Sequence, residues 1–288
     1  MEASLLSLFT LVLLVGGGVL TAGQTGPSFD QNYYITFGND HIRSIRQGRE
    51  LRLAMDRSTG SGIASKLTYS SGFFQMELKL PAGNSAGVVT AFYLRSQSNN
   101  AHDELDFEFL GNLPGLPYTL QTNVFTSGVG NREQRIQLWF DPTAAYHTYR
   151  ILWNPHQVVF FVDNIPIRVY MNKVNIGVGY PYQPMQILTS LWDGESWATD
   201  GGRIKTDWSQ APFRAYLRSF EINGCPSKNS NTDDQQCYTS KYWWNEKQYW
   251  KLNHAQQIEY EAIKKYHMTY DYCSDRSRTP KPPPECPQ

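Results

Sequence analysis

The 288-residue chain has no excess of charge of either sign. Lys and Arg total 26, Asp and Glu total 26, and the formal net charge is zero. Nucleic-acid binding requires a basic surface that attracts phosphates, so this balance predicts no nucleic-acid partner. The chain also lacks the sequon Asn-x-Ser/Thr at every position, which predicts that it carries no N-linked glycan.

Long apolar runs are also scarce, because only one segment, Leu5–Val15, is largely apolar. Glycines and small residues follow it, which is typical of a secretory signal peptide and too short for a membrane span. We expect the signal to cover residues 1–23, with cleavage between Ala22 and Gln24, although no Lys or Arg precedes the apolar run. No later segment is apolar enough to cross a bilayer, so we expect no membrane partner after cleavage.

Cysteine is limited to four residues, Cys225, Cys237, Cys273 and Cys286. In a secreted chain an even number of cysteines predicts disulfides, and three pairings are open. Two local bridges, Cys225 to Cys237 and Cys273 to Cys286, are the simplest pattern. A metal site is the weaker alternative, because no Cys-x-x-Cys pair and no suitably spaced His accompany them. The sequence therefore predicts no metal and no cofactor.

The most informative segment of the chain is residues 102–111, which read HDELDFEFLG. Side chains of a strand alternate between two faces, so Glu104, Asp106 and Glu108 share one face and the apolar residues between them share the other. An exposed amphipathic strand is the ordinary explanation of such alternation. However, acids are rare in strands and like charges on one face repel each other, which favours a functional role.

The spacing of the outer two acids fits the hydrolysis of glycosidic bonds. A rise of about 3.3 Å per residue separates the Cα atoms of Glu104 and Glu108 by about 13 Å. Side chains that lean together would leave carboxyl groups about 5 to 6 Å apart, as in a retaining glycosidase. Asp106, between them, is expected to tune their ionisation. The spacing alone does not say which glutamate is the nucleophile.

The segment HDELDFEFLG resembles the active-site strand of plant xyloglucan endotransglucosylase/hydrolases, in glycoside hydrolase family 16, with Leu105 in place of the more usual Ile. The resemblance implies that Glu104 is the nucleophile, Asp106 its helper and Glu108 the general acid/base. It also implies the two local disulfides. The similarity extends over roughly residues 27–288.

The same resemblance implies which residues contact the sugars of the substrate. These substrate-binding candidates are Glu108, Gln121, Thr122, Asn123, Asn131, Arg132, Glu133, Ser196, Trp197, Gly201 and Arg278, with Arg276 as the alternative to Arg278. Trp192 and Trp197 have a second explanation as ordinary core aromatics. Aromatic faces beside amide and guanidinium groups nevertheless favour a carbohydrate groove.

Between the signal peptide and Gly224 the chain reads as short strands separated by turns. Residues 146–153 and 158–162 predict a hairpin, and 73–80 alternate as a further strand. These patterns predict an all-β sandwich, which the resemblance narrows to a concanavalin-like β-jelly roll over residues 24–224. Residues 225–288 are expected to form a short C-terminal extension with a helix at 255–267.

The resemblance thus implies a secreted enzyme of the plant cell wall and apoplast. Such an enzyme cleaves the backbone of a xyloglucan donor and transfers it to a xyloglucan acceptor or to water. We expect a monomer. The alternatives are a glucanase acting on mixed-linkage or other β-glucan, and a non-catalytic carbohydrate-binding jelly roll, which would not need both Glu104 and Glu108.

Overall fold

The computed structural model describes residues 26–227 and 234–286. The predicted signal peptide and its cleavage site lie outside the described residues. Within those residues no helix combines the length and the apolar character that a membrane span needs. Most of the described chain consists of antiparallel strands and the turns between them.

The described residues form sixteen strands and two α-helices. The strands are β1 Tyr33–Phe37, β2 Ile42–Ile45, β3 Glu50–Met55, β4 Ser61–Ser65, β5 Tyr69–Lys79, β6 Val88–Ser96, β7 Glu104–Leu110, β8 Thr119–Phe125, β9 Gln134–Gln137, β10 His147–Trp153, β11 Gln157–Val162, β12 Ile165–Met171, β13 Met185–Asp193, β14 Phe213–Arg218, β15 Asn223–Pro226 and β16 Met268–Asp271. The α-helices are α1 Phe29–Asn32 and α2 His254–Tyr266. Short 3-10 helices lie at Asn39–His41, Arg46–Gly48, Val174–Ile176, Thr199–Gly202, Trp208–Gln210, Gln235–Tyr238, Trp243–Asn245 and Lys247–Tyr249.

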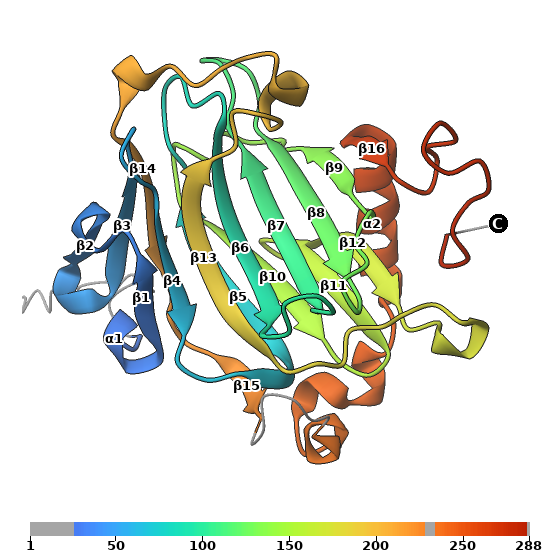
Figure 1. Ribbon diagram of the computed structural model, residues 1–288. Coiled ribbons are helices and arrows are strands. Elements are labelled where there is room, and N and C mark those ends of the chain that lie inside the picture. The colour runs from blue at the N-terminus through green and yellow to red at the C-terminus, as the bar shows by residue number, and fades with distance from the viewer. Residues whose placement is uncertain (1–25, 228–233, 287–288) are drawn as a thin grey trace, which may run out of the picture.

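The strands form two layers that face each other. One layer has the order β4-β13-β6-β7-β8-β9-β16, and behind it lie β5, β10, β11 and β12 (Figure 1). The two layers are joined where β13 meets β5 through the single pair Met185 and Tyr69. The fold is therefore the predicted all-β sandwich, and β7 occupies the middle of the front layer.

Aromatic side chains fill the space between the layers. Phe107 of β7 meets Phe160 of β11 with ring centroids 5.1 Å apart, and Phe109 meets Tyr149 of β10 at 4.5 Å. All four side chains are completely buried. Edge-to-face aromatic pairs add to the stabilisation that burial provides. The apolar face of the acidic strand is thus fixed against the back layer.

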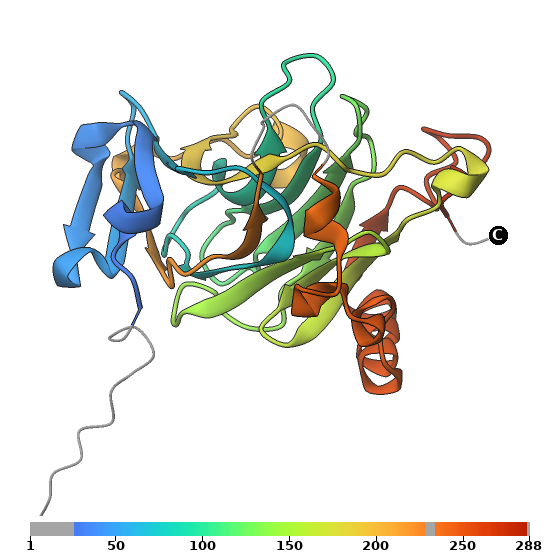
Figure 2. The same cartoon turned by 90° about the horizontal axis from the view of Figure 1, so that it is seen from below.

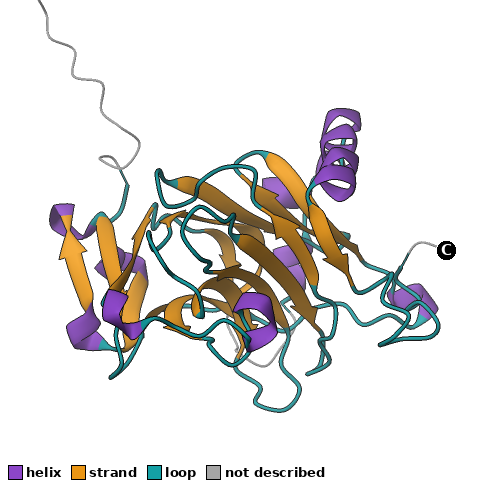
Figure 3. Cartoon of the chain, turned by 90° about the horizontal axis from the view of Figure 1, so that it is seen from above, coloured by secondary structure: helices purple, strands orange, loops and turns teal. Residues whose placement is uncertain are grey.

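The predicted hairpin and helix are confirmed with small shifts of their ends. Strands β10 and β11 form an antiparallel hairpin, and α2 covers His254–Tyr266. Helix α2 begins with a capping box, in which Asn253 accepts from the backbone N–H of Gln256 and the Gln256 side chain accepts from that of Asn253. Figures 2 and 3 show that α2 stands outside the strand layers, and it contacts β12.

The C-terminal extension is attached to the back layer by a second apolar cluster. Trp244 packs there with Leu152, Phe161 and the Cys225–Cys237 disulfide. Its indole Nε1 also donates a hydrogen bond of 3.0 Å to Ser71 Oγ. The second disulfide joins Cys273 and Cys286 further along. Both bridges of the predicted pattern are therefore present.

Replacement of Trp244 by Ala tests the importance of this cluster. Trp244 is 4% exposed, and we expect the change to lower the free energy of unfolding by about 3 kcal/mol or more, because a large cavity opens. Trp250 is 40% exposed and provides the control, with a smaller loss for Trp250→Ala. Urea unfolding measures both, and equal losses would contradict the assignment of Trp244 as the anchor.

Candidate active site

The three acids of β7 share a hollow on the outer face of the front layer. Leu105, Phe107 and Phe109 of β7 point inward and are fully buried. Glu104, Asp106 and Glu108 instead line an open cavity of about 520 Å³. The expectation that alternation places all three acids on one face is confirmed.

Each acid has its own neighbours on the adjacent strands, because β6 and β8 both run antiparallel to β7. Arg95 and Phe125 lie opposite Glu104, Tyr93 and Asn123 lie opposite Asp106, and Ala91 and Gln121 lie opposite Glu108. Three acids at regular spacing therefore have three different surroundings. Their chemistry depends on these differences.

Glu104 is the acid that has cationic partners. Its Oε2 atom lies 2.9 Å from His102 Nε2 and 3.3 Å from Arg95 Nε. Burial raises the pKa of Glu104, whereas the charge of Arg95 and a hydrogen bond with Asp106 act in the opposite direction. The His102 ring packs beside Phe125 with centroids 5.2 Å apart. The surroundings of Glu104 thus favour its ionised form relative to those of the other two acids.

Asp106 is the most buried of the three acids, with 6% of its surface exposed. Burial and then the charges of Glu104 and Glu108 raise its pKa well above the ordinary range, which the positive charge of Arg168 only partly offsets. These surroundings favour the protonated form of Asp106. It can donate that proton in its hydrogen bond to Glu104.

Glu108 has an amide partner in place of a cation. Gln121 Nε2 donates a hydrogen bond of 2.7 Å to Glu108 Oε2, and Arg135 Nε donates one of 2.8 Å to Gln121 Oε1. Burial raises the pKa of Glu108, the Gln121 hydrogen bond opposes the rise, and the charges of Glu104 and Glu133 add to it. Glu108 is therefore the outer acid better suited to hold a proton.

A buried arginine supports the site from the back layer. Arg168 of β12 is 1% exposed, and it donates hydrogen bonds to the carbonyl oxygens of Thr122 at 2.8 Å and Arg132 at 2.6 Å. Burial lowers the pKa of Arg168. Thr122 is fully buried and its Oγ1 also accepts from Arg168. The side chain of Thr122 therefore braces β8 from within and does not line the cavity.

Aromatic residues line the cavity on the side of β13. Trp192 and Trp197 lie with ring centroids 6.1 Å apart, and both contribute to the cavity wall. They also pack against a small buried apolar cluster, so they are both structural and exposed to the hollow. Ser196 and Gly201 are exposed in the following loop and do not belong to the cavity lining.

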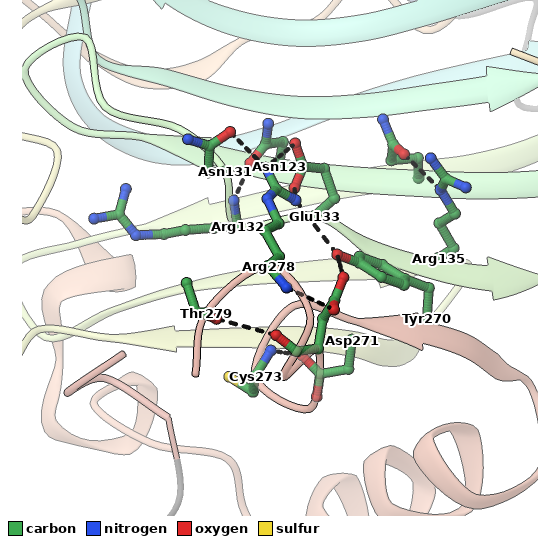
Figure 4. Close-up of polar contacts among 12 residues, drawn as sticks. Asn123, Asn131, Arg132, Glu133, Arg135, Tyr270, Asp271, Cys273, Arg278 and Thr279 are labelled. Carbon is green, nitrogen blue, oxygen red and sulfur yellow. Dashed lines mark hydrogen bonds and ion pairs between the residues drawn. The ribbon is translucent and has the colours of Figure 1, made fainter. Parts of the chain in front are cut away.

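The C-terminal extension reaches the opposite side of the cavity. Arg278 donates a hydrogen bond of 2.6 Å to Glu133 Oε2, one of 3.3 Å to the Tyr270 hydroxyl, and another to Asn131 Oδ1 (Figure 4). Glu133 lines the cavity. Of the two arginines considered from the sequence, Arg278 therefore lies at this edge.

Arg132 links this edge to the end of the chain. Its Nε atom lies 2.8 Å from Glu285 Oε1. Its backbone N–H donates to Asn123 Oδ1 at 3.1 Å, and Asn123 lines the cavity. Arg132 thus connects the C-terminal extension to the centre of the cavity, although its own side chain is occupied by protein contacts.

The position of β7 is fixed by Asp103, the residue that precedes it. The Asp103 carboxylate is 2% exposed and accepts three backbone N–H groups, from Ser127 at 2.8 Å, Tyr182 at 2.8 Å and Gln183 at 2.9 Å. A carboxylate that receives three such bonds holds the loops at this end of the strand together.

Several lining residues were missed from the sequence. Tyr93, Arg95 and Phe125 line the cavity, and the alternation of residues along β6 and β8 is the signal that could have found them. Phe37 also lines it, but it comes from β1, and no local pattern relates that strand to β7. Within the described ranges no group of three or more His, Cys, Asp or Glu side chains is arranged to hold a metal ion.

Two family models match the chain. Residues 29–210 match glycosyl hydrolases family 16, and residues 238–286 match the xyloglucan endo-transglycosylase C-terminus. Xyloglucan endotransglucosylase/hydrolase protein 2 of Arabidopsis thaliana is 51% identical over 96% of this chain and 94% of its own length. Protein 3 of the same name and species is 52% identical over 90% of this chain and 88% of its own.

Solved structures share the fold of the strand layers. The Bacillus licheniformis beta-glucanase superposes with a TM-score of 0.52 at 24% identity, covering 65% of this chain and 89% of its own. The Crh5 transglycosylase superposes with a TM-score of 0.57 at 25% identity, covering 73% of this chain and 84% of its own. These neighbours agree with a jelly-roll sandwich.

The replacement Asp103→Asn tests the anchor of β7. We expect it to lower the free energy of unfolding by about 1 to 3 kcal/mol, because an amide replaces a carboxylate that accepts three buried N–H groups. Asp40→Asn, at an exposed position, is the control and should leave stability unchanged. Denaturant unfolding compares them, and a fully stable Asp103→Asn protein would exclude the anchoring role.

Proposed function

Because the chain belongs to the xyloglucan endotransglucosylase/hydrolases, within glycosyl hydrolase family 16, we propose that it cleaves the β-1,4-glucan backbone of xyloglucan with retention of configuration. The released glycosyl group passes to another xyloglucan chain or to water. The observation that carries the mechanism is the different surroundings of Glu104 and Glu108 on one strand.

The proposed roles follow from those surroundings. Glu104, beside Arg95 and His102, is the ionised nucleophile. Glu108, beside Gln121 and without a directly bonded cation, is the protonated acid. Asp106 keeps its own proton and steadies Glu104. Environments that separate the pKa values of two neighbouring carboxyl groups give them different roles in one reaction.

The reaction proceeds in two displacements. Glu104 attacks the anomeric carbon, the glycosidic C–O bond breaks, and the leaving glucan oxygen takes the proton of Glu108. The Glu108 carboxylate then accepts a proton from a sugar 4-hydroxyl or from water, whose oxygen displaces Glu104 from the same carbon. Two inversions leave the configuration retained. The acceptor gains the glycosyl group, and both glutamates return to their initial states.

The two sides of the cavity suit the two substrates. We place the donor chain on the β13 side, where Trp192 and Trp197 offer flat faces to sugar rings. The acceptor lies toward Asn131, Glu133 and Arg278, whose amide, carboxylate and guanidinium groups suit sugar hydroxyls.

The lining of the cavity supports part of the substrate contacts expected from the sequence. Gln121 and Asn123 line the cavity itself. Arg132 is joined to it through the hydrogen bond from its backbone N–H to Asn123. Ser196 and Gly201 lie outside the lining, and their contacts stay a prediction. Thr122 contributes through the backbone it braces.

The location, oligomeric state and domain organisation of the protein are also proposed from its family. The enzyme is secreted after removal of residues 1–23, and it acts in the cell wall and apoplast as a monomer. Residues 24–224 form the catalytic jelly roll, and 225–288 form the extension that lengthens the acceptor side. Arg278 binds Glu133 and Glu285 binds Arg132, and these contacts support the proposed roles of the two segments.

The defining experiment follows a labelled xyloglucan oligosaccharide incubated with xyloglucan and the secreted protein. We expect label to enter long chains while reducing ends stay nearly constant, and Glu104→Gln to abolish incorporation, because the nucleophile is lost. Size-exclusion chromatography with a reducing-end assay measures both products.

The other outcomes separate the alternatives. Reducing ends without label transfer would identify a hydrolase. Faster cleavage of an undecorated mixed-linkage glucan would favour a glucanase. Binding of the oligosaccharide without any turnover, in wild type and Glu104→Gln alike, would identify a non-catalytic carbohydrate-binding protein and exclude the proposed mechanism.

The pH dependence tests the two carboxyl roles. Activity rises as Glu104 loses its proton and falls as Glu108 loses its own, and burial raises both pKa values. We therefore expect a bell-shaped profile of kcat/KM centred above the ordinary Glu pKa of about 4.3. Glu108→Gln should lose the alkaline limb and about 10²-fold or more in kcat. An unchanged alkaline limb would assign that limb to another group.

A further inference from the structure

Arg95 lies beside the catalytic strand, and so far it has been described only as a neighbour that favours the ionised form of Glu104. It is on β6, directly opposite Glu104 in the register of the two strands. Tyr93 precedes it on the same face, and both line the cavity. An opposite-charge pair across neighbouring strands is a stabilising arrangement. Here one member of the pair is the proposed nucleophile.

The contact is directed at one oxygen of the carboxylate. Arg95 Nε lies 3.3 Å from Glu104 Oε2, and His102 Nε2 lies 2.9 Å from the same atom. The Glu104 side chain is 17% exposed and that of Arg95 is 43% exposed. A carboxylate oxygen that two donors approach has a restricted rotation about its last bond. Arg95 and His102 therefore fix the orientation of Glu104.

We propose that Arg95 is a positioning residue that holds Glu104 oriented and ionised in the free enzyme and shortens the lifetime of the glycosyl ester formed on it. This inference rests on the proposed function, because it requires Glu104 to be the nucleophile. It adds a residue on β6 to a mechanism otherwise confined to the acids of β7.

The physical argument compares the two states of Glu104. The free carboxylate carries a full negative charge, which the Arg95 guanidinium attracts. The ester carries none, so the attraction is lost when the ester forms and returns as the ester breaks. A cation at this position therefore stabilises the free enzyme and the departing carboxylate relative to the ester. The ester therefore breaks down faster with Arg95 present than without it, whether the acceptor is a sugar hydroxyl or water.

The other charged and titratable groups around Glu104 do not replace this effect. They are Tyr93 on β6, His102 before β7, Asp106 and Glu108 on β7, and Arg168 on β12, whose charge acts on Asp106. Phe125, the β8 residue opposite Glu104, carries no charge. Of the two side chains at Oε2, the guanidinium of Arg95 is the one with a permanent positive charge.

The test compares Arg95→Gln, which removes the charge, with Arg95→Lys, which keeps it. Arg43→Gln is the control, because Arg43 is an exposed arginine of the distant strand β2. Two quantities are measured with xyloglucan oligosaccharides: the pH profile of kcat/KM, and the fraction of enzyme present as glycosyl ester after acid quenching, read by intact mass.

For Arg95→Gln we expect the acid limb to move up by about half a pH unit, because an exposed pair is partly screened. The steady-state fraction of ester should rise about threefold, the rate change that corresponds to the same half unit. Arg95→Lys should lie near the wild type in both measurements, and Arg43→Gln should not differ from it.

Equal behaviour of Arg95→Gln and Arg95→Lys, or an acid limb that does not move in Arg95→Gln, would overturn the inference. Thermal unfolding of each variant separates these results from a loss of fold. If Arg95→Gln is unstable, Arg95→Lys can still be compared with the wild type. If peptide mapping of the quenched wild type finds no glycosyl group on Glu104, the proposed function itself fails. If Glu104 carries the glycosyl group but the acid limb of Arg95→Gln does not shift, only the role of Arg95 is refuted.

Discussion

Three carboxyl groups on one face of a largely buried strand oppose one another's ionisation. Burial raises the pKa of Glu104, Asp106 and Glu108, and their mutual repulsion raises that of Asp106 further. The fold accommodates this constraint by giving each acid a different neighbour. Arg95 lies beside the first, the second is nearly buried, and Gln121 lies beside the third. The order of ionisation, and with it the proposed division of roles, follows from these neighbours.

The two-layer sandwich places these neighbours beside the three acids. Edge-to-face packing of Phe107 and Phe109 against the back layer keeps the acids facing outward, since a slip of one residue would turn every side chain to the other face. Arg168 extends from the back layer to the backbone of Thr122 and places a positive charge beneath Asp106. Asp103 ties the beginning of the strand to two loops. Packing of the core and electrostatics of the site are therefore parts of one arrangement.

The sequence predicted the parts of this arrangement that depend on local patterns. Alternation along 102–111 located the acids, and propensity located the β10–β11 hairpin and helix α2. It did not reveal Arg95 or Arg168, because their partners are set by strand register and by contact between layers. Thr122 is a different case, because a local pattern decides its orientation. It lies between two cavity residues in the sequence, and strand alternation turns its side chain to the core, although the resemblance implies a substrate contact.

Arg132 shows how the C-terminal extension is joined to the strand of acids. Its carbonyl accepts from Arg168, its backbone N–H donates to Asn123, and its guanidinium binds Glu285. Asn123 lies opposite Asp106 across the β7–β8 ladder. The end of the chain, held by the Cys273–Cys286 disulfide, is thus three contacts away from the central acid. These contacts of the extension also stabilise the turn between β8 and β9, which carries part of the cavity wall.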